Sequence, residues 1–232
     1  MKETGTIMSG SHPVDILEGR KTMTRRTRGL KEINECPDAW EQFGFDNSGR
    51  FSFRLIGGDR ILNIACPYGQ VGDRLWVKET WCLVNYGYLT TDSVEVEVGY
   101  NKTKWNQDQR WDSASHTISK TIWDKYRGND KWRSPLFMPR WASRITREIT
   151  AIRAERLQEI TEGDIRKEGI TDLGLVPVNT AMLATGTNNL NDLRIALGRA
   201  EYASLWDSLN GKRYPWKMNP WVWPIEFGMI KQ

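Results

Sequence analysis

Sustained helical patterns occur in two stretches of this chain, and short extended segments lie before, between and after them. The helical stretches are residues 161–169, where Thr161 and Asp164 have the spacing of a capping box, and 191–211, whose apolar residues mostly recur at helical spacing up to Gly211. A shorter helix that starts with Pro13 is predicted at 14–17. Alternating or β-branched patterns predict strands at 51–56, 60–64, 74–82, 94–98, 144–152 and 221–229, and residues 57–59 predict a hairpin turn between the first two. A chain that starts and ends in strands around two helices fits a small α+β barrel.

The length of 232 residues fits one domain with insertions better than two full domains. The hydrophobic content of 39% and the charged content of 27% are those of a globular protein, and they indicate neither a disordered nor a fibrous chain. From about 83 to 134 the strand pattern weakens, and 173–190 is rich in small and turn-forming residues. We therefore expect a single domain over 1–232, with an insertion at about 83–134 and a flexible loop at about 173–190.

The cysteines and histidines do not have the spacing of a metal site. Cys36, Cys66 and Cys82 form no close pair, and the chain has two histidines beside them. The sequence also lacks an apolar run of the roughly 18 residues that a membrane span requires, and its start lacks the apolar core of a secretory signal. We expect a cytoplasmic protein with reduced thiols, no metal, no cofactor and no membrane partner.

The run from Gly19 to Arg26 concentrates four cations and two hydroxyls. Such a run can hold a phosphate or activate a nucleophile, and it can equally be a solvated basic turn. Neighbouring cations favour the neutral amine of Lys21, which could then accept the hydroxyl proton of Thr24. Residues three apart in a regular strand point to opposite faces, so this pairing requires Lys21 to lie on a bend or at the end of a helix. Gly19 could supply that bend.

Glu79 lies on the apolar face of its predicted strand. If residues 74–81 are extended, Glu79 shares a face with Leu75, Val77 and Trp81. A carboxylate among apolar neighbours is costly unless it is paired or hydrogen-bonded. Glu79 therefore either forms an ion pair with a buried cation or is positioned for proton transfer. The pattern leaves both interpretations open.

Arg140 and Arg144 flank Trp141, an arrangement that can bind phosphates while an aromatic ring stacks on a base. Arg25 and Arg26 are further candidates for nucleic-acid contact. The alternative for residues 140–144 is a packed corner in which Arg140 and Arg144 pair with surface carboxylates. The net charge of +4 permits a nucleic-acid partner without requiring one.

Together, the motifs at 19–26, 67–81, 138–144 and 219–223 resemble the ASCH family of PUA-like β-barrel proteins, in the version found in bacteriophages and prophages. The resemblance covers most of the chain except the segments near 83–134 and 173–190. It implies an α+β PUA-like barrel with flanking helices. Some small family members are amidohydrolases that deacetylate N4-acetylcytidine with a Lys, a Thr and a Glu, which match Lys21, Thr24 and Glu79 here.

The leading hypothesis is a protein that acts on RNA or a modified nucleoside, with an amidohydrolase for N4-acetylcytidine-like substrates as its catalytic form. One alternative is a non-catalytic RNA-binding module that contacts phosphates through its arginines. Another is a phage structural or host-interaction protein in which the Trp-rich insertion is the contact surface. The sequence leaves the substrate and the oligomeric state open.

Overall fold

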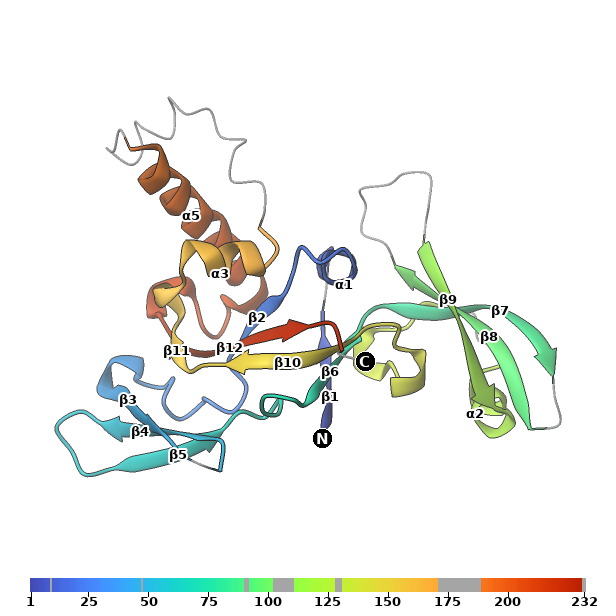
Figure 1. Cartoon of the computed structure of the whole chain (residues 1–232), viewed down its shortest axis with the longest axis horizontal. Coiled ribbons are helices and arrows are strands. Elements are labelled where there is room, and N and C mark those ends of the chain that lie inside the picture. The colour runs from blue at the N-terminus through green and yellow to red at the C-terminus, as the bar shows by residue number, and fades with distance from the viewer. Residues whose placement is uncertain are drawn as a thin grey trace. The chain divides into compact units, whose positions relative to one another are not determined.

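The computed structural model describes residues 1–8, 10–46, 48–89, 92–101, 111–127, 131–170 and 189–230. The fold is mixed α+β, as predicted, and strands make up more of its described elements than helices (Figure 1). The chain divides into two compact units, each assembled from segments far apart in sequence. Unit 1 comprises Met1–Glu18, Arg74–Glu148 and Met229–Gln232, and unit 2 comprises Gly19–Asp73 and Ile149–Gly228.

Unit 1 begins with β1 (Glu3–Ile7), which pairs in parallel with β6 (Arg74–Lys78). The first residues of β10 (Thr146–Ile152) pair antiparallel with β6. Gly5 of β1 lies opposite Trp76 of β6, and a Cβ at Gly5 would stand 2.6 Å from the indole ring. A glycine at this position therefore leaves room for the indole ring to lie against β1. The short helix α1 (His12–Leu17) starts with Pro13 in its first turn, as its sequence predicts.

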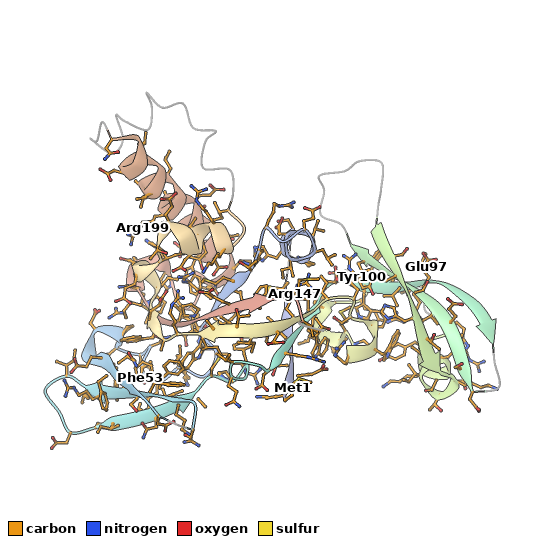
Figure 2. All side chains as sticks on the ribbon, viewed as in Figure 1. Met1, Phe53, Glu97, Tyr100, Arg147 and Arg199 are labelled. Atoms are coloured by element: carbon orange, nitrogen blue, oxygen red, sulfur yellow. The ribbon has the colours of Figure 1, made fainter. Side chains whose placement is uncertain are left out.

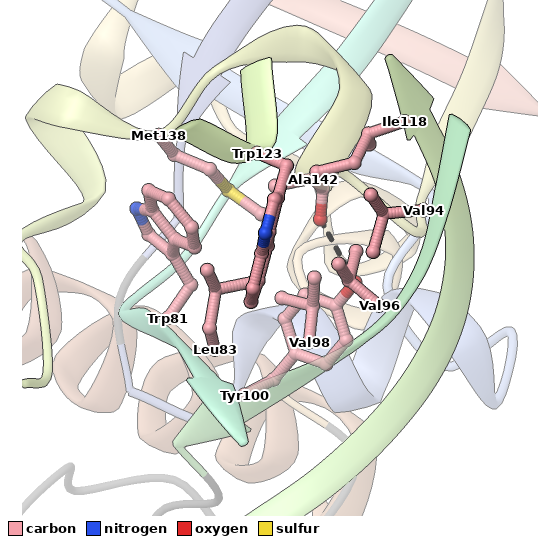
Figure 3. Packing of buried hydrophobic residues seen from close by; sticks show 10 residues of the cluster. All are labelled: Trp81, Leu83, Val94, Val96, Val98, Tyr100, Ile118, Trp123, Met138 and Ala142. Atoms are coloured by element: carbon pink, nitrogen blue, oxygen red, sulfur yellow. Dashed lines mark hydrogen bonds between the residues drawn. The ribbon is translucent and has the colours of Figure 1, made fainter. Parts of the chain in front are cut away.

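The segment predicted as an insertion contains a complete antiparallel sheet in unit 1. Its strands are β7 (Trp81–Leu89), β8 (Ser93–Asn101) and β9 (Trp111–Ser119), and helix α2 (Lys120–Tyr126) follows. Alternate valines of β8 are buried and pack with Trp81, Trp123 and Met138 in an apolar core (Figure 3). The sequence predicted one strand at 94–98, because the polar residues of its partners obscured the pattern. The predicted strand 74–82 is divided in two, since β6 ends at Lys78.

Unit 2 pairs segments from the two ends of the sequence. The edge strand β2 (Met23–Arg26) and the short β11 (Glu155–Arg156) each pair antiparallel with β12 (Trp221–Gly228). A separate antiparallel sheet consists of β3 (Trp40–Phe45), β4 (Arg50–Leu55) and β5 (Ile61–Ala65). The hairpin between β4 and β5 is confirmed at the predicted turn, where Gly57 has a positive φ of 74°.

Two helices of unit 2 confirm the sequence pattern. Helix α3 (Glu162–Lys167) starts with the predicted capping box, because the Thr161 hydroxyl accepts from the Asp164 N–H and the Asp164 carboxylate accepts from the Thr161 N–H. Helix α5 (Leu190–Asn210) buries Tyr202 and Trp206 in an apolar cluster with Ile165 of α3. The predicted loop at 173–190 falls almost wholly outside the described residues.

Short 3-10 helices connect these elements, at Pro37–Ala39, Pro135–Phe137, Arg140–Ala142, Leu157–Glu159 and Trp216–Met218. All three cysteines are free thiols. In the part of the chain that the structure describes, the helices are too short or too polar to cross a membrane.

Candidate active site

Lys21 lies between a turn that ends at Arg20 and the start of β2. Gly19 adopts a positive φ of 74°, a conformation that favours glycine, and β2 starts only at Met23. Lys21 itself forms an isolated antiparallel bridge with Glu168, and the Thr22 N–H donates to the Lys167 carbonyl at 2.8 Å. The end of α3 is thus fastened to the basic run by backbone contacts.

The side chains of Lys21 and Glu168 form an ion pair that is almost fully buried. The Lys21 Nζ lies 2.6 Å from Oε2 of Glu168 and 2.8 Å from its main-chain oxygen. The exposed fractions of the two side chains are 1% and 5%. The next residue, Gly169, has a φ of 95°, and a Cβ there would stand 3.3 Å from the Lys21 Cβ. A glycine after Glu168 therefore allows the lysine to approach.

Arg25 of β2 is bound to three carboxylates in the same interior. Its guanidinium nitrogens lie 2.7 Å from Glu155, 2.9 Å from Asp164 and 3.4 Å from Glu168. Burial works to lower the pKa of the guanidinium, but the neighbouring charges of Glu168 and Glu155 outweigh burial and raise the pKa. Arg25 therefore stays positively charged. Its side chain is fully buried, so it is not accessible to a phosphate of a nucleic acid.

Asp164 connects this interior to the start of α3. Besides its capping role, its carboxylate accepts from Arg25 and from Arg153, the latter at 3.1 Å. Burial works to raise the pKa of Asp164, but the two guanidinium charges prevail and lower it. Because Asp164 and Glu168 are four residues apart, they emerge from one side of α3 and its C-terminal end, which explains how both reach the same arginine.

Tyr202 of α5 completes the group. Its hydroxyl donates to Oε1 of Glu168 at 3.3 Å, and its ring lies 6.0 Å from the Arg25 guanidinium carbon. Burial, and then the charge on Glu168, raise the pKa of the phenol well above its usual range. We call this group the Glu168 cluster, and its members are Lys21, Arg25, Glu155, Asp164, Glu168 and Tyr202.

Thr24 and Arg26 occupy the other positions of β2. Thr24 is buried and lies in register with Ile225 of β12, whereas Arg26 is half-buried and lies opposite Trp223. Alternation along β2 places their side chains on the face opposite to Arg25. The structure therefore unites Lys21 and Arg25 on one carboxylate, and Thr24, which precedes Arg25 in sequence, lies on the opposite face of β2. Nucleic-acid contact by Arg26 stays a prediction.

Glu79 is buried, as its strand position predicted, and it has a cationic partner in unit 1. Arg144 donates to both of its carboxylate oxygens, each at 3.0 Å, and the two side chains are 4% and 10% exposed. The Arg144 guanidinium carbon also lies 4.2 Å from the ring centre of Tyr100, which is labelled in Figure 2 and donates to the Ala142 carbonyl (Figure 3). This geometry agrees with the first interpretation of the sequence pattern, in which Glu79 pairs with a buried cation. Its catalytic role stays a prediction, and Lys21 and Thr24 belong to the other unit.

Arg140 and Trp141 differ in exposure although they are adjacent. Arg140 is exposed, and it donates to Glu3 at 2.8 Å and to Thr146 at 3.0 Å. Hydrogen bonding from Arg140 lowers the pKa of Glu3. Trp141 is half-buried and meets Trp81 edge to face, with ring centres 5.7 Å apart. Arg140 remains available to a phosphate by exposure, while Trp141 packs against the apolar core of unit 1.

The sequence interpretation missed Glu168 and Tyr202. The only local signal for Glu168 is its place beside Gly169 at the end of a predicted helix, and 147 positions separate it from Lys21. In the sequence, Tyr202 is indistinguishable from the apolar residues that form the buried face of α5. Both residues gain their significance from contacts between distant segments, which periodicity does not reveal.

Within the described ranges, no group of three or more His, Cys, Asp or Glu side chains is arranged to hold a metal ion. Comparisons with protein-family models, with curated proteins and with solved structures gave no match. The chemistry of the Glu168 cluster is therefore argued from its own geometry.

Proposed function

We propose that this chain is an ASCH-type protein of PUA-like architecture that hydrolyses an acylated exocyclic amine, as in N4-acetylcytidine, on a nucleoside or RNA. The observation that carries the proposal is the 2.6 Å contact between Lys21 and Glu168 in an almost dry interior. Removing such a pair from water costs more than its attraction commonly returns. Buried ionisable side chains whose desolvation is unfavourable are concentrated at functional sites. The Glu168 cluster includes residues of the Thr-bearing strand β2, so we place the proton transfer there.

The pair can move protons during acyl transfer. Lys21 passes a proton to Glu168, and the resulting amine accepts the hydroxyl proton of Thr24 as its oxygen bonds to the acyl carbon. The C–N bond then breaks, and the nucleoside amine leaves with the proton held by Glu168. Water hydrolyses the Thr24 ester, which releases the carboxylic acid and restores the hydroxyl. In this scheme Glu168 takes the role that the sequence resemblance had assigned to Glu79.

Two features of β2 support Thr24 as the attacking group. Thr24 is the hydroxyl-bearing residue of β2, and it directly precedes Arg25, which binds the same carboxylate as Lys21. Thr22 provides a matched hydroxyl in the same basic run. The run therefore contains both the test residue and its control.

The test is an assay of the purified chain against a panel of acylated nucleosides and short acylated RNAs, with the free amine and the carboxylic acid separated by chromatography. Thr24→Val keeps the size and branching but removes the hydroxyl, and we expect it to abolish turnover, whereas Thr22→Val retains it. If Thr24→Val retains the parent rate, a water activated by Lys21 replaces Thr24 as the nucleophile. If the parent binds RNA and hydrolyses no acylated substrate, the hydrolase proposal gives way to the binding module.

A further inference from the structure

The carboxylate of Glu168 has donors on both of its oxygens. Lys21 binds Oε2, while Oε1 lies 3.3 Å from the Tyr202 hydroxyl and 3.4 Å from a guanidinium nitrogen of Arg25. The donors come from three places in the sequence: the bend before β2, β2 itself and α5. A carboxylate held from both oxygens cannot rotate about its terminal bond without losing a partner.

We propose that Tyr202 and Arg25 are positioning residues, which keep Glu168 ionised at rest and direct its Oε2 at Lys21. Donors to a carboxylate favour its charged form, and donors on one oxygen fix where the other oxygen points. The two residues would thereby set the starting state for the proton transfer proposed above. The catalytic part of this inference rests on the proposed function, whereas the charge and orientation of Glu168 do not.

Tyr202 is the better of the two residues to test. It lies in the apolar cluster of α3 and α5, 3% exposed, where a hydroxyl is costly unless it is bonded. Its raised pKa, caused by burial and then by Glu168, keeps it protonated and therefore a donor. Arg25 also neutralises Glu155 and Asp164, so its removal would disturb three carboxylates together.

Several charged groups share the surroundings of Glu168 and have to be kept constant. Lys21 and Arg25 face it from the β2 side, and Tyr202 faces it from α5. Asp164 on its own helix and Glu155 on β11 act on it through Arg25. Replacing the tyrosine by phenylalanine leaves all of these charges in place.

The experiment compares the full-length parent with Tyr202→Phe and with the control Tyr214→Phe, which alters a tyrosine of the same apolar cluster. The carboxyl carbon of Glu168 is followed by NMR between pH 3 and 8 in protein labelled at glutamate, and Glu168→Gln assigns its signal. We expect Tyr202→Phe to move the titration midpoint upward by about 1 to 2 pH units, the size of one lost donor to a charged group. Tyr214→Phe should leave the midpoint unchanged.

The outcomes separate this inference from the proposed hydrolase. If turnover is present, the acid limb of kcat in Tyr202→Phe should move with the carboxyl midpoint while KM changes little. If the midpoint moves and the parent has no turnover, the positioning role stands and the hydrolase fails. An unchanged midpoint in a folded Tyr202→Phe, or an equal shift in Tyr214→Phe, overturns the inference whether or not the parent is active.

Discussion

Lys21 and Glu168 are both charged and both almost without solvent contact, which couples their contributions to stability. Removing either partner leaves the other as a buried charge, at a cost of about 3–5 kcal/mol in comparable pairs. Glu168 keeps Arg25 and Tyr202 as donors, so Lys21→Met should fall at the lower end of that range. Lys21→Met/Glu168→Gln should cost clearly less than the sum of the single variants.

The parent, the two single variants and the double variant form a double-mutant cycle. Their free energies of unfolding in urea measure the coupling between Lys21 and Glu168 directly. Glutamine and methionine keep most of the packed volume, so cavity effects stay small. Additive losses in the cycle would contradict the buried pair, because independent groups do not compensate for one another.

The two arginines of the 138–144 motif should respond differently to truncation. Arg144→Ala removes the cationic partner of the buried Glu79, so it should lower the free energy of unfolding by roughly 3 kcal/mol or more. Arg140→Ala breaks an exposed pair with Glu3 and should cost less than about 1 kcal/mol. If Arg140 contacts a phosphate, the same variant should reduce the salt slope of RNA binding by about one. Equal losses of stability would contradict this difference in burial.

At the scale of the element, α3 links helix capping to the Glu168 cluster. Its first turn carries Asp164, which both caps the helix and neutralises Arg25, and its C-terminal end carries Glu168. A change at the capping position therefore reaches the ion pairs. The surface pair between Glu162 and Arg166 lies on the same helix and offers a matched control.

Asp164→Asn should change how stability depends on pH. The pKa of Asp164 is lowered in the folded protein, so its contribution is present above the unfolded value near 4 and is lost as pH falls through the lower folded value. The variant should be less stable than the parent at pH 7, and the difference should shrink below about pH 4. Denaturant titrations from pH 2.5 to 7 measure this. A gap that is constant over pH, or an equal effect of Glu162→Gln, would show that the charge of Asp164 is not responsible.

At the scale of the whole molecule, the sequence predicted elements better than the site. The short-range patterns of β4 and β5, the capping box at Thr161 and the apolar stripe of α5 depend on neighbouring residues, and these are confirmed. The sheet of β7, β8 and β9 was largely missed, because cross-strand partners decide burial there. Glu168 was missed for the same reason, since Lys21 meets it only through the fold.

The net charge of +4 allows a whole-molecule test of the substrate class. Hydrolysis of an uncharged acylated nucleoside should vary less than about twofold between 50 and 200 mM salt, because no phosphate contacts are broken. Binding that depends on six or more phosphates would fall by about a thousandfold or more over that range. A steep loss of nucleoside turnover with salt would point to an anionic substrate instead.

The most direct measurement of the central claim compares Glu168→Gln with Glu79→Gln in the hydrolysis of N4-acetylcytidine. Both changes remove the charge of a buried glutamate and keep its shape, and both proteins are assayed at a temperature where circular dichroism shows them folded. The account predicts that kcat/KM falls at least about a hundredfold in Glu168→Gln and less than about threefold in Glu79→Gln. A large loss in Glu79→Gln with retained activity in Glu168→Gln would contradict it.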